Sequence, residues 1–220
     1  MSPGALAEPH AHLSGLTNCL SCHTWGSKDL SPKCLECHTP IQTRIEDELG
    51  FHGNLEENDC LECHTDHMNR NFEMIHWEPS QKDFDHVQTG YELEGKHLKL
   101  NCNECHKSEF IISDDILDYA KSKKTSDVLS STFLGLGSEC ATCHVDVHAN
   151  EFVDQTCDDC HSEVNWTDAR DNYDHDFDTN FPIRGAHKQL ECEKCHTATQ
   201  DAVGDFQAQQ FTGLKFNLCT

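Results

Sequence analysis

The chain has 220 residues, of which 36% are hydrophobic, and carries a formal net charge of −23 at pH 7. A chain this polar, with a mean hydropathy of −0.66, has little apolar material for a self-sufficient core. The acidic balance argues against nucleic-acid binding, which requires basic patches, and against binding to anionic lipid surfaces. No run of 18 apolar residues is present, so we expect no transmembrane segment in this chain.

The motif Cys-x-x-Cys-His occurs seven times and uses 14 of the 15 cysteines. The cysteine pairs are Cys19 and Cys22, Cys34 and Cys37, Cys60 and Cys63, Cys102 and Cys105, Cys140 and Cys143, Cys157 and Cys160, and Cys192 and Cys195. The histidines that follow them are His23, His38, His64, His106, His144, His161 and His196.

Three interpretations compete for this motif: structural zinc, a disulfide framework and covalent c-type haem. A zinc site needs four ligands and places no demand on the residue after the second cysteine. Haem c requires a histidine there, because the two thiols bond the vinyl groups while that histidine coordinates the iron. All seven pairs have the histidine. The sequence therefore favours seven covalently attached haem c groups, which would supply the apolar mass that the polypeptide lacks.

Residues 1–33 read as an entry segment with the first haem motif. Its start, "MSPGALAEPHAH", shows neither the basic n-region nor the apolar h-region of a signal peptide. Since c-type haem is normally attached outside the cytoplasmic membrane, we expect an extracytoplasmic location, in the periplasm or at the cell surface. The leader would then have been removed, or the chain would be a fragment.

Two haem repeats follow, at residues 34–106 and 140–196. Each contains a pair of close motifs, a Trp, an Asp-His, a Gly-x-His and a third motif. Residues 107–139 are read as a linker, in which "SDDILDYAKSKK" (113–124) has the apolar spacing of a short amphipathic helix. Elsewhere the motif spacing forces frequent turns. We expect a mostly irregular chain with short α-helices and little or no β-sheet.

The tail, residues 197–220, ends on "FTGLKFNLCT", which matches "FLGLGSECATCH" (133–144). In both, Phe-x-Gly-Leu is followed by a cysteine four or five residues later. Cys219 is therefore read as the first cysteine of an eighth motif and the tail as the start of a truncated third repeat. The alternative is a lone free thiol.

The second axial position of each iron must come from outside the motif. Ten histidines are spare and only three methionines exist, which favours bis-histidine ligation. His86 and His175, His97 and His187, and His52 and His148 occupy matching places in the two repeats. His67 follows a motif in "CHTDH", and His10 precedes the first motif, with His12 as its competitor. The predicted distal set is His10, His52, His67, His86, His97, His148, His175 and His187. His76 has no counterpart.

The run "W…DH…T.F.I.G.H….C..CH", with "C..CH.D.H" before it, resembles multihaem c-type cytochromes of the class III (cytochrome c3-like) family. The resemblance covers about residues 5–196. It implies a multihaem cytochrome c fold organised around stacked bis-histidine haems that carry electrons without chemistry of their own. The family's distal positions fall on the same eight histidines, which would suit seven haems plus the one begun at Cys219.

The favoured function is thus electron transfer in extracytoplasmic, anaerobic respiration, by a carrier that is not an enzyme and has no catalytic residues. The expected partners are redox proteins: other cytochromes, a quinol-oxidising complex or a terminal reductase. One alternative is a multihaem reductase of a small nitrogen or sulfur oxyanion, which would need an iron with an open position. Several such enzymes carry Cys-x-x-Cys-Lys, which is absent here. The other is a self-associating subunit of a cytochrome filament.

Overall fold

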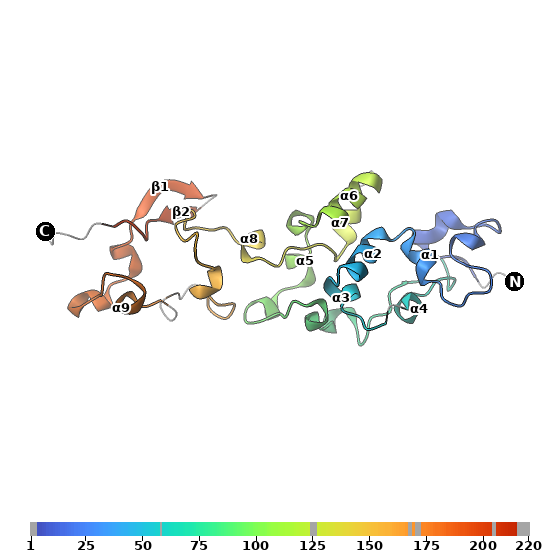
Figure 1. Ribbon diagram of the computed structural model, residues 1–220, viewed down its shortest axis with the longest axis horizontal. Coiled ribbons are helices and arrows are strands. Elements are labelled where there is room, and N and C mark those ends of the chain that lie inside the picture. Colours follow the sequence, from blue (N-terminus) through green and yellow to red (C-terminus); the bar gives the residue numbers. More distant parts are fainter. Residues whose placement is uncertain are drawn as a thin grey trace. The chain divides into compact units, whose positions relative to one another are not determined.

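The computed structural model describes residues 4–57, 59–123, 127–166, 169, 173–203 and 206–214. Short helices, single 3-10 turns and irregular chain make up most of this part, and its extended structure is one two-stranded hairpin (Figure 1). The expected fold class, mostly irregular with short helices and little β-sheet, is confirmed. Within the described residues no helix is both long enough and apolar enough to cross a bilayer.

The chain divides into two compact units. The first comprises residues 1–93 and 111–135, and the second comprises residues 94–110 and 136–220. The predicted haem repeats, entry segment, linker and tail have other boundaries and stay predictions.

The first unit is the more helical one. Its helices are α1 (Ser31–Leu35), α2 (Thr39–Glu46), α3 (Gly50–Gly53), α4 (Cys60–Cys63), α6 (Asp114–Lys123) and α7 (Asp127–Ser131). Its 3-10 turns are Glu8–Leu13, Cys19–Ser21, Gln81–Asp83 and His86–Thr89. The helix predicted within residues 113–124 is α6. Acidic residues open it and lysines close it, which suits the helix dipole.

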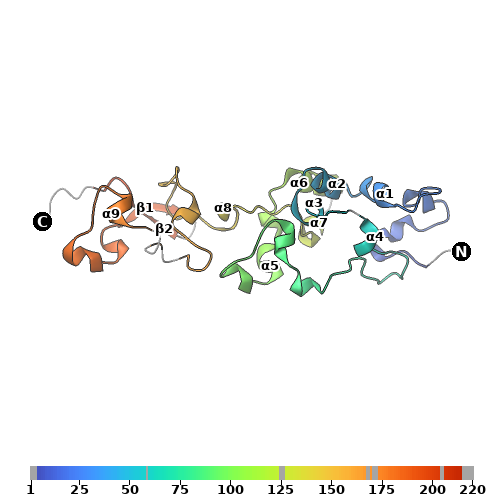
Figure 2. The same cartoon turned by 60° about the horizontal axis from the view of Figure 1, so that its bottom comes forward.

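A small apolar core forms where α6 packs in the first unit. Ile111, Ile116 and Ala120 are buried, and α6 lies beside α2 (Figure 2). Arg44 of α2 is only 5% exposed, and its guanidinium bonds Asp115 Oδ2 at 2.7 Å. This buried ion pair fixes α6 against α2.

The second unit holds shorter elements. Its helices are α5 (Cys102–Cys105), α8 (Cys140–Cys143) and α9 (His175–Asp178). Its 3-10 turns include His97–Lys99, Ser108–Phe110, Cys157–Asp159, Gly185–Gln189 and Cys192–Lys194. Strand β1 (Ala198–Val203) pairs antiparallel with β2 (Phe206–Gln209), with an irregular register between Ala198 and Ala202.

Burial of apolar side chains is sparse in the described part of the chain. The buried apolar side chains there are Ala7, Ile111, Ile116, Ala120 and Ala208. By contrast, Trp25 is 95% exposed, Leu16 92% and Phe177 88%. A chain of this size normally buries most of its apolar surface. The polypeptide therefore presents apolar surface to something other than itself.

Candidate haem-binding sites

Every Cys-x-x-Cys-His motif folds into the same single turn. In all seven, the backbone N–H of the histidine donates to the carbonyl of the first cysteine, at 2.8 or 2.9 Å. A hydrogen bond between residues four apart is one helical turn, which brings the first cysteine and the histidine onto one side of the chain. Asp59 caps α4, and Asn101 with Glu104 forms a capping box on α5.

The fourteen cysteines of these motifs are free thiols. The first cysteines of neighbouring motifs approach one another at equivalent places in the two units. Burial and, after it, the nearby Cys60 thiol raise the pKa of the Cys34 thiol to about 11. Burial raises the pKa of the Cys140 thiol, and the nearby Cys157 thiol is the next largest cause of this shift. Two attachment points thus lie side by side in each unit.

Zinc and disulfides find no support in this geometry. Among the described residues, no three His, Cys, Asp or Glu side chains are grouped so that they could hold a metal ion by themselves. A structural zinc site requires four such ligands in a tetrahedron. The described motif cysteines do not pair as disulfides either.

Six of the seven motif histidines lie opposite a predicted distal histidine. Each pair belongs to one unit, and its ring centroids are 5.9–6.3 Å apart. The pairs are His38 with His10 at 6.0 Å, His23 with His67 at 6.3 Å, His64 with His52 at 6.3 Å, His144 with His97 at 6.2 Å, His161 with His148 at 5.9 Å, and His196 with His175 at 6.0 Å.

This spacing fits one metal ion between two imidazoles. Two metal–nitrogen bonds of about 2 Å each, plus about 1 Å from ring nitrogen to ring centre on both sides, place the centroids about 6 Å apart. The imidazole pairs, with two thiols beside each motif histidine, therefore fit a bis-histidine haem c.

The remaining predicted ligands are placed less tightly. His86 has Phe84 edge-on at 5.5 Å, and His187 is exposed in the turn Gly185–Gln189. His10, and not its competitor His12, faces His38. His76 is 72% exposed and lies 3.6 Å from Glu78. Cys219 lies outside the described residues. Ligation of iron by His86 and His187 stays a prediction.

Several paired imidazoles are held in the neutral form that binds metals. Burial lowers the pKa of His52, and the neighbouring His64 and Arg44 lower it further. Burial also lowers the pKa of His64, although a hydrogen bond with the Met74 carbonyl opposes the shift. Burial and then His10 do the same for His38. A neutral imidazole keeps a lone pair free for a metal.

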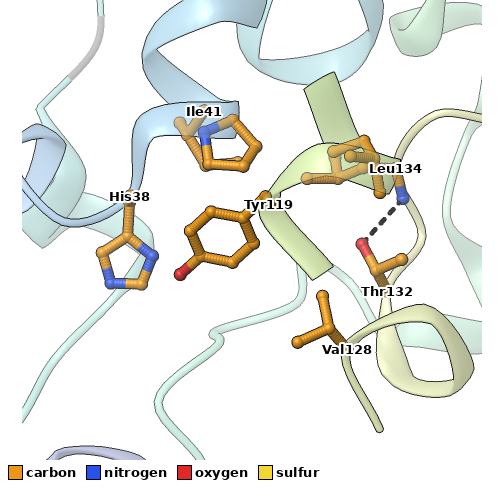
Figure 3. A pocket seen from close by; sticks show the side chains of 8 residues that line it. His38, Ile41, Tyr119, Val128, Thr132 and Leu134 are labelled. Atoms are coloured by element: carbon orange, nitrogen blue, oxygen red, sulfur yellow. Dashed lines mark hydrogen bonds between the residues drawn. The ribbon is translucent and has the colours of Figure 1, made fainter. Parts of the chain in front are cut away.

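An apolar hollow of about 130 Å³ borders the second motif. Figure 3 shows side chains of α2, α6 and α7 converging on it. Its lining includes His38, Ile41, Tyr119, Val128 and Leu134. A concave apolar wall beside a motif histidine suits the edge of a porphyrin. The segment 111–135 thus serves the second motif as a cover.

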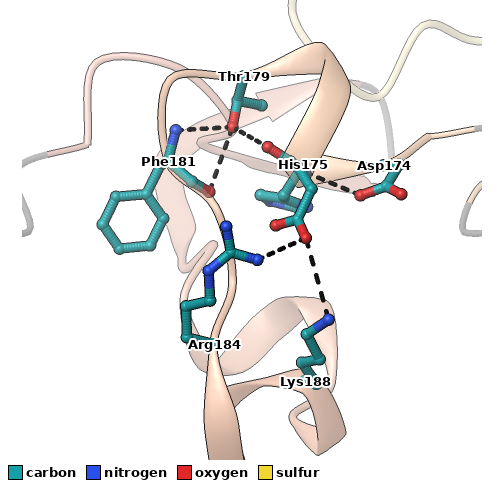
Figure 4. A network of polar contacts seen from close by, with 7 residues as sticks. Asp174, His175, Thr179, Phe181, Arg184 and Lys188 are labelled. Carbon is teal, nitrogen blue, oxygen red and sulfur yellow. Dashed lines mark hydrogen bonds and ion pairs between the residues drawn. The ribbon is translucent and has the colours of Figure 1, made fainter.

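A polar network holds His175 towards His196. The Asp174 carboxylate accepts from the N–H of Asp176 at 2.8 Å and so caps α9 (Figure 4). Thr179 Oγ1 donates to the carbonyl of His175 at 2.8 Å. Arg184 reaches back to Asp176 Oδ2 at 2.7 Å. These bonds order the loop that carries His175.

The sequence analysis missed the residues that contact the Nδ1 atoms of the paired imidazoles. The carboxylates Asp66 and Asp146 lie 2.8 and 3.1 Å from Nδ1 of His10 and His148. The signal was present in "CHTDH" and "CHVDVH", where an Asp stands two residues after the motif histidine. Trp166, noted only as a repeat marker, stacks on His144 at 5.0 Å and on His161 at 4.5 Å.

Comparison with known proteins agrees with this geometry. Residues 87–162, which include three of the seven motifs, match the family model described as cytochrome c7 and related cytochrome c. No curated protein and no solved structure matches the chain. The match and the repeated motif turns together show that residues 87–162 are similar to cytochrome c7 and related multihaem cytochromes c.

Proposed function

We propose that the chain is an electron-transfer cytochrome that carries electrons along seven bis-histidine haems in extracytoplasmic respiration. The observation that carries the proposal is the set of six imidazole pairs with centroids 5.9–6.3 Å apart, each with a motif histidine on one side. The family match supports multihaem electron transfer. The haem number and the respiratory role are our inference.

The residues would hold the cofactor in a way that suits electron transfer. Bound haem supplies a one-electron couple between ferric and ferrous iron. An imidazole on each side of the iron would leave no open position for a substrate. Histidine in place of methionine also favours low reduction potentials. The neighbouring attachment cysteines, such as Cys34 with Cys60 and Cys140 with Cys157, would keep successive haem edges close.

The eighth site begun at Cys219 remains part of the proposal. His97 lies in the repeat 34–106 and faces His144, which belongs to the first motif after that repeat. His187 occupies the matching place in the second repeat. We infer that His187 serves the motif that begins at Cys219. His86, which matches His175 in the repeat, is the remaining proposed distal residue.

The test combines the intact mass with a pyridine haemochrome spectrum and electron paramagnetic resonance (EPR). We expect seven haems per chain and low-spin ferric signals from two axial imidazoles. A colourless protein, or one whose thiols hold zinc, would refute the proposal. Free Cys219 thiol in a chain of full natural length would remove the eighth site alone.

A second experiment separates a conduit from a reductase. Because both axial positions are occupied in the proposed sites, the reduced protein should show little fast binding of carbon monoxide or nitrite. Rapid, stoichiometric binding at one haem would instead favour an open iron and the reduction of a small nitrogen or sulfur oxyanion.

A further inference from the structure

We propose that the carboxylates of Asp66, Asp146 and Glu163 lower the reduction potentials of three haems by contacting one axial imidazole at each. The inference rests on the proposed function, since it takes the contacted imidazoles as iron ligands. These imidazoles are His10, His148 and His97, respectively.

Asp66 is the best placed of the three. Its Oδ1 accepts from the backbone N–H of Ala7 at 2.7 Å and of His67 at 2.6 Å, which fixes the carboxylate. Its Oδ2 then faces Nδ1 of His10 at 2.8 Å. A side chain that is 17% exposed thus presents a fixed negative charge to the imidazole.

Asp146 follows the fifth motif as Asp66 follows the third, but it serves a histidine close in sequence. Its Oδ1 accepts from the backbone N–H of His148 at 2.9 Å and lies 3.1 Å from Nδ1 of the same residue. Its Oδ2 accepts from the backbone N–H of Asn150 at 3.0 Å. The side chain is 44% exposed, so solvent screens its charge more strongly than that of Asp66.

Glu163 is brought to His97 by a backbone contact. The N–H of Lys96 donates to the Glu163 carbonyl at 2.9 Å, and Gly95, at φ +49°, packs directly on that carbonyl. A side chain at Gly95 would collide with it. The Glu163 carboxylate Oε2 lies 3.0 Å from Nδ1 of His97, although it is not aligned for a hydrogen bond. Its effect is therefore mainly that of a nearby charge.

Two other predicted distal imidazoles have different surroundings at Nδ1. Nδ1 of His52 is buried without a hydrogen-bond partner in the described structure. Nδ1 of His67 lies 3.2 Å from the neutral carbonyl of Gly4. When Nε2 binds the metal, the proton sits on Nδ1, and a carboxylate acceptor there makes the imidazole a stronger donor. A stronger donor and a nearby negative charge both favour ferric iron.

The consequence is a graded set of potentials in the first unit, where the His10/His38 haem should lie below the His52/His64 haem. Electrons would then rest preferentially on haems without a carboxylate contact.

The test is spectroelectrochemical titration of the holoprotein with Asp66→Asn, Glu163→Gln and Asp146→Asn, read haem by haem by EPR. The amide keeps the shape of each side chain but removes the charge. We expect Asp66→Asn to raise one potential by about 59 mV, a tenfold change in a one-electron equilibrium. Glu163→Gln and Asp146→Asn should raise one potential each by less, in the order of their side-chain exposures of 36% and 44%.

Asp118→Asn is the matched control. Asp118 is 73% exposed, pairs with Lys121 on α6, and loses the same charge in the same unit as Asp66. Shifts no larger than in this control, with seven haems and low-spin signals intact, would overturn the inference and leave the proposed function standing. Missing haems or high-spin iron in the unaltered protein would instead refute the proposed function. If Asp66→Asn fails to load haem, Glu163→Gln decides the matter.

Discussion

The two units hold similar imidazole pairs in different protein surroundings. Each contains three imidazole pairs with nearly equal spacing. In the first unit, helices α6 and α7 add a small buried core around Ile116. In the second, the chain after the last motif forms the hairpin β1–β2, and the Gln210 carbonyl lies 3.1 Å from Nδ1 of His196. The candidate sites of the two units thus have in common the motif turn and a facing histidine, and not a protein core of the same kind.

The two repeat tryptophans show the same divergence. Trp77 meets Phe84 and Phe133 edge-on, at 5.6 and 6.0 Å, and so packs within the aromatic cluster of the first unit. Trp166 stacks instead on His144 and His161. An equal place in a repeat therefore does not give an equal role, because the insertion at residues 111–135 supplies Phe133 only to the first unit.

The largest expected effect comes from removing the cofactors. A chain expressed without haem attachment should lose most of its ordered structure, because its described polypeptide buries few apolar side chains. Hydrogen exchange should find residual protection in α6, where Ile116 is 2% exposed, and almost none in α5, α8 and α9. Native-like protection in both units would contradict this reading of the core.

The next effect is confined to the first unit. Ile116→Ala removes a fully buried side chain and should cost about 2–5 kcal/mol of unfolding free energy. Hydrogen exchange of the α6 amides, which reports local unfolding of the helix, measures this loss of free energy. Ile112→Ala is the matched control, since Ile112 is 57% exposed and should lose much less. Equal losses would show that α6 is not held by this core.

Substitution of the two tryptophans tests the difference between the units directly. Trp166→Ala should perturb the EPR signals of two haems at once, those of His144 and His161, because the indole orients both imidazoles. Trp77→Ala should instead lower the stability of the first unit by about 1–3 kcal/mol while leaving the haem signals in place. The idea fails if Trp166→Ala alters stability alone.

What the sequence could predict follows from how local each feature is. The helix α6 needs only neighbouring residues, so the apolar spacing within residues 113–124 predicts it. Six of the predicted distal histidines face motif histidines. Which motif each one meets could not be read, because His67 reaches back to His23 while His148 reaches forward to His161. Such pairings depend on the path of the folded chain.

The smallest expected effects are at the caps of two motif turns, one in each unit. Asp59 accepts from the N–H of Leu61 at 3.0 Å at the start of α4, and Asn101 caps α5 reciprocally with Glu104. Loss of either cap, in Asp59→Ala or Asn101→Ala, should cost about 1 kcal/mol. Amide exchange at His64 and His106 would report it. Because haem attachment also pins each turn covalently, both variants should keep all their haems. A variant that loses its haem would show that the cap, and not the thioether bonds, orders the turn. The two units would then depend on protein contacts more than their sparse burial indicates.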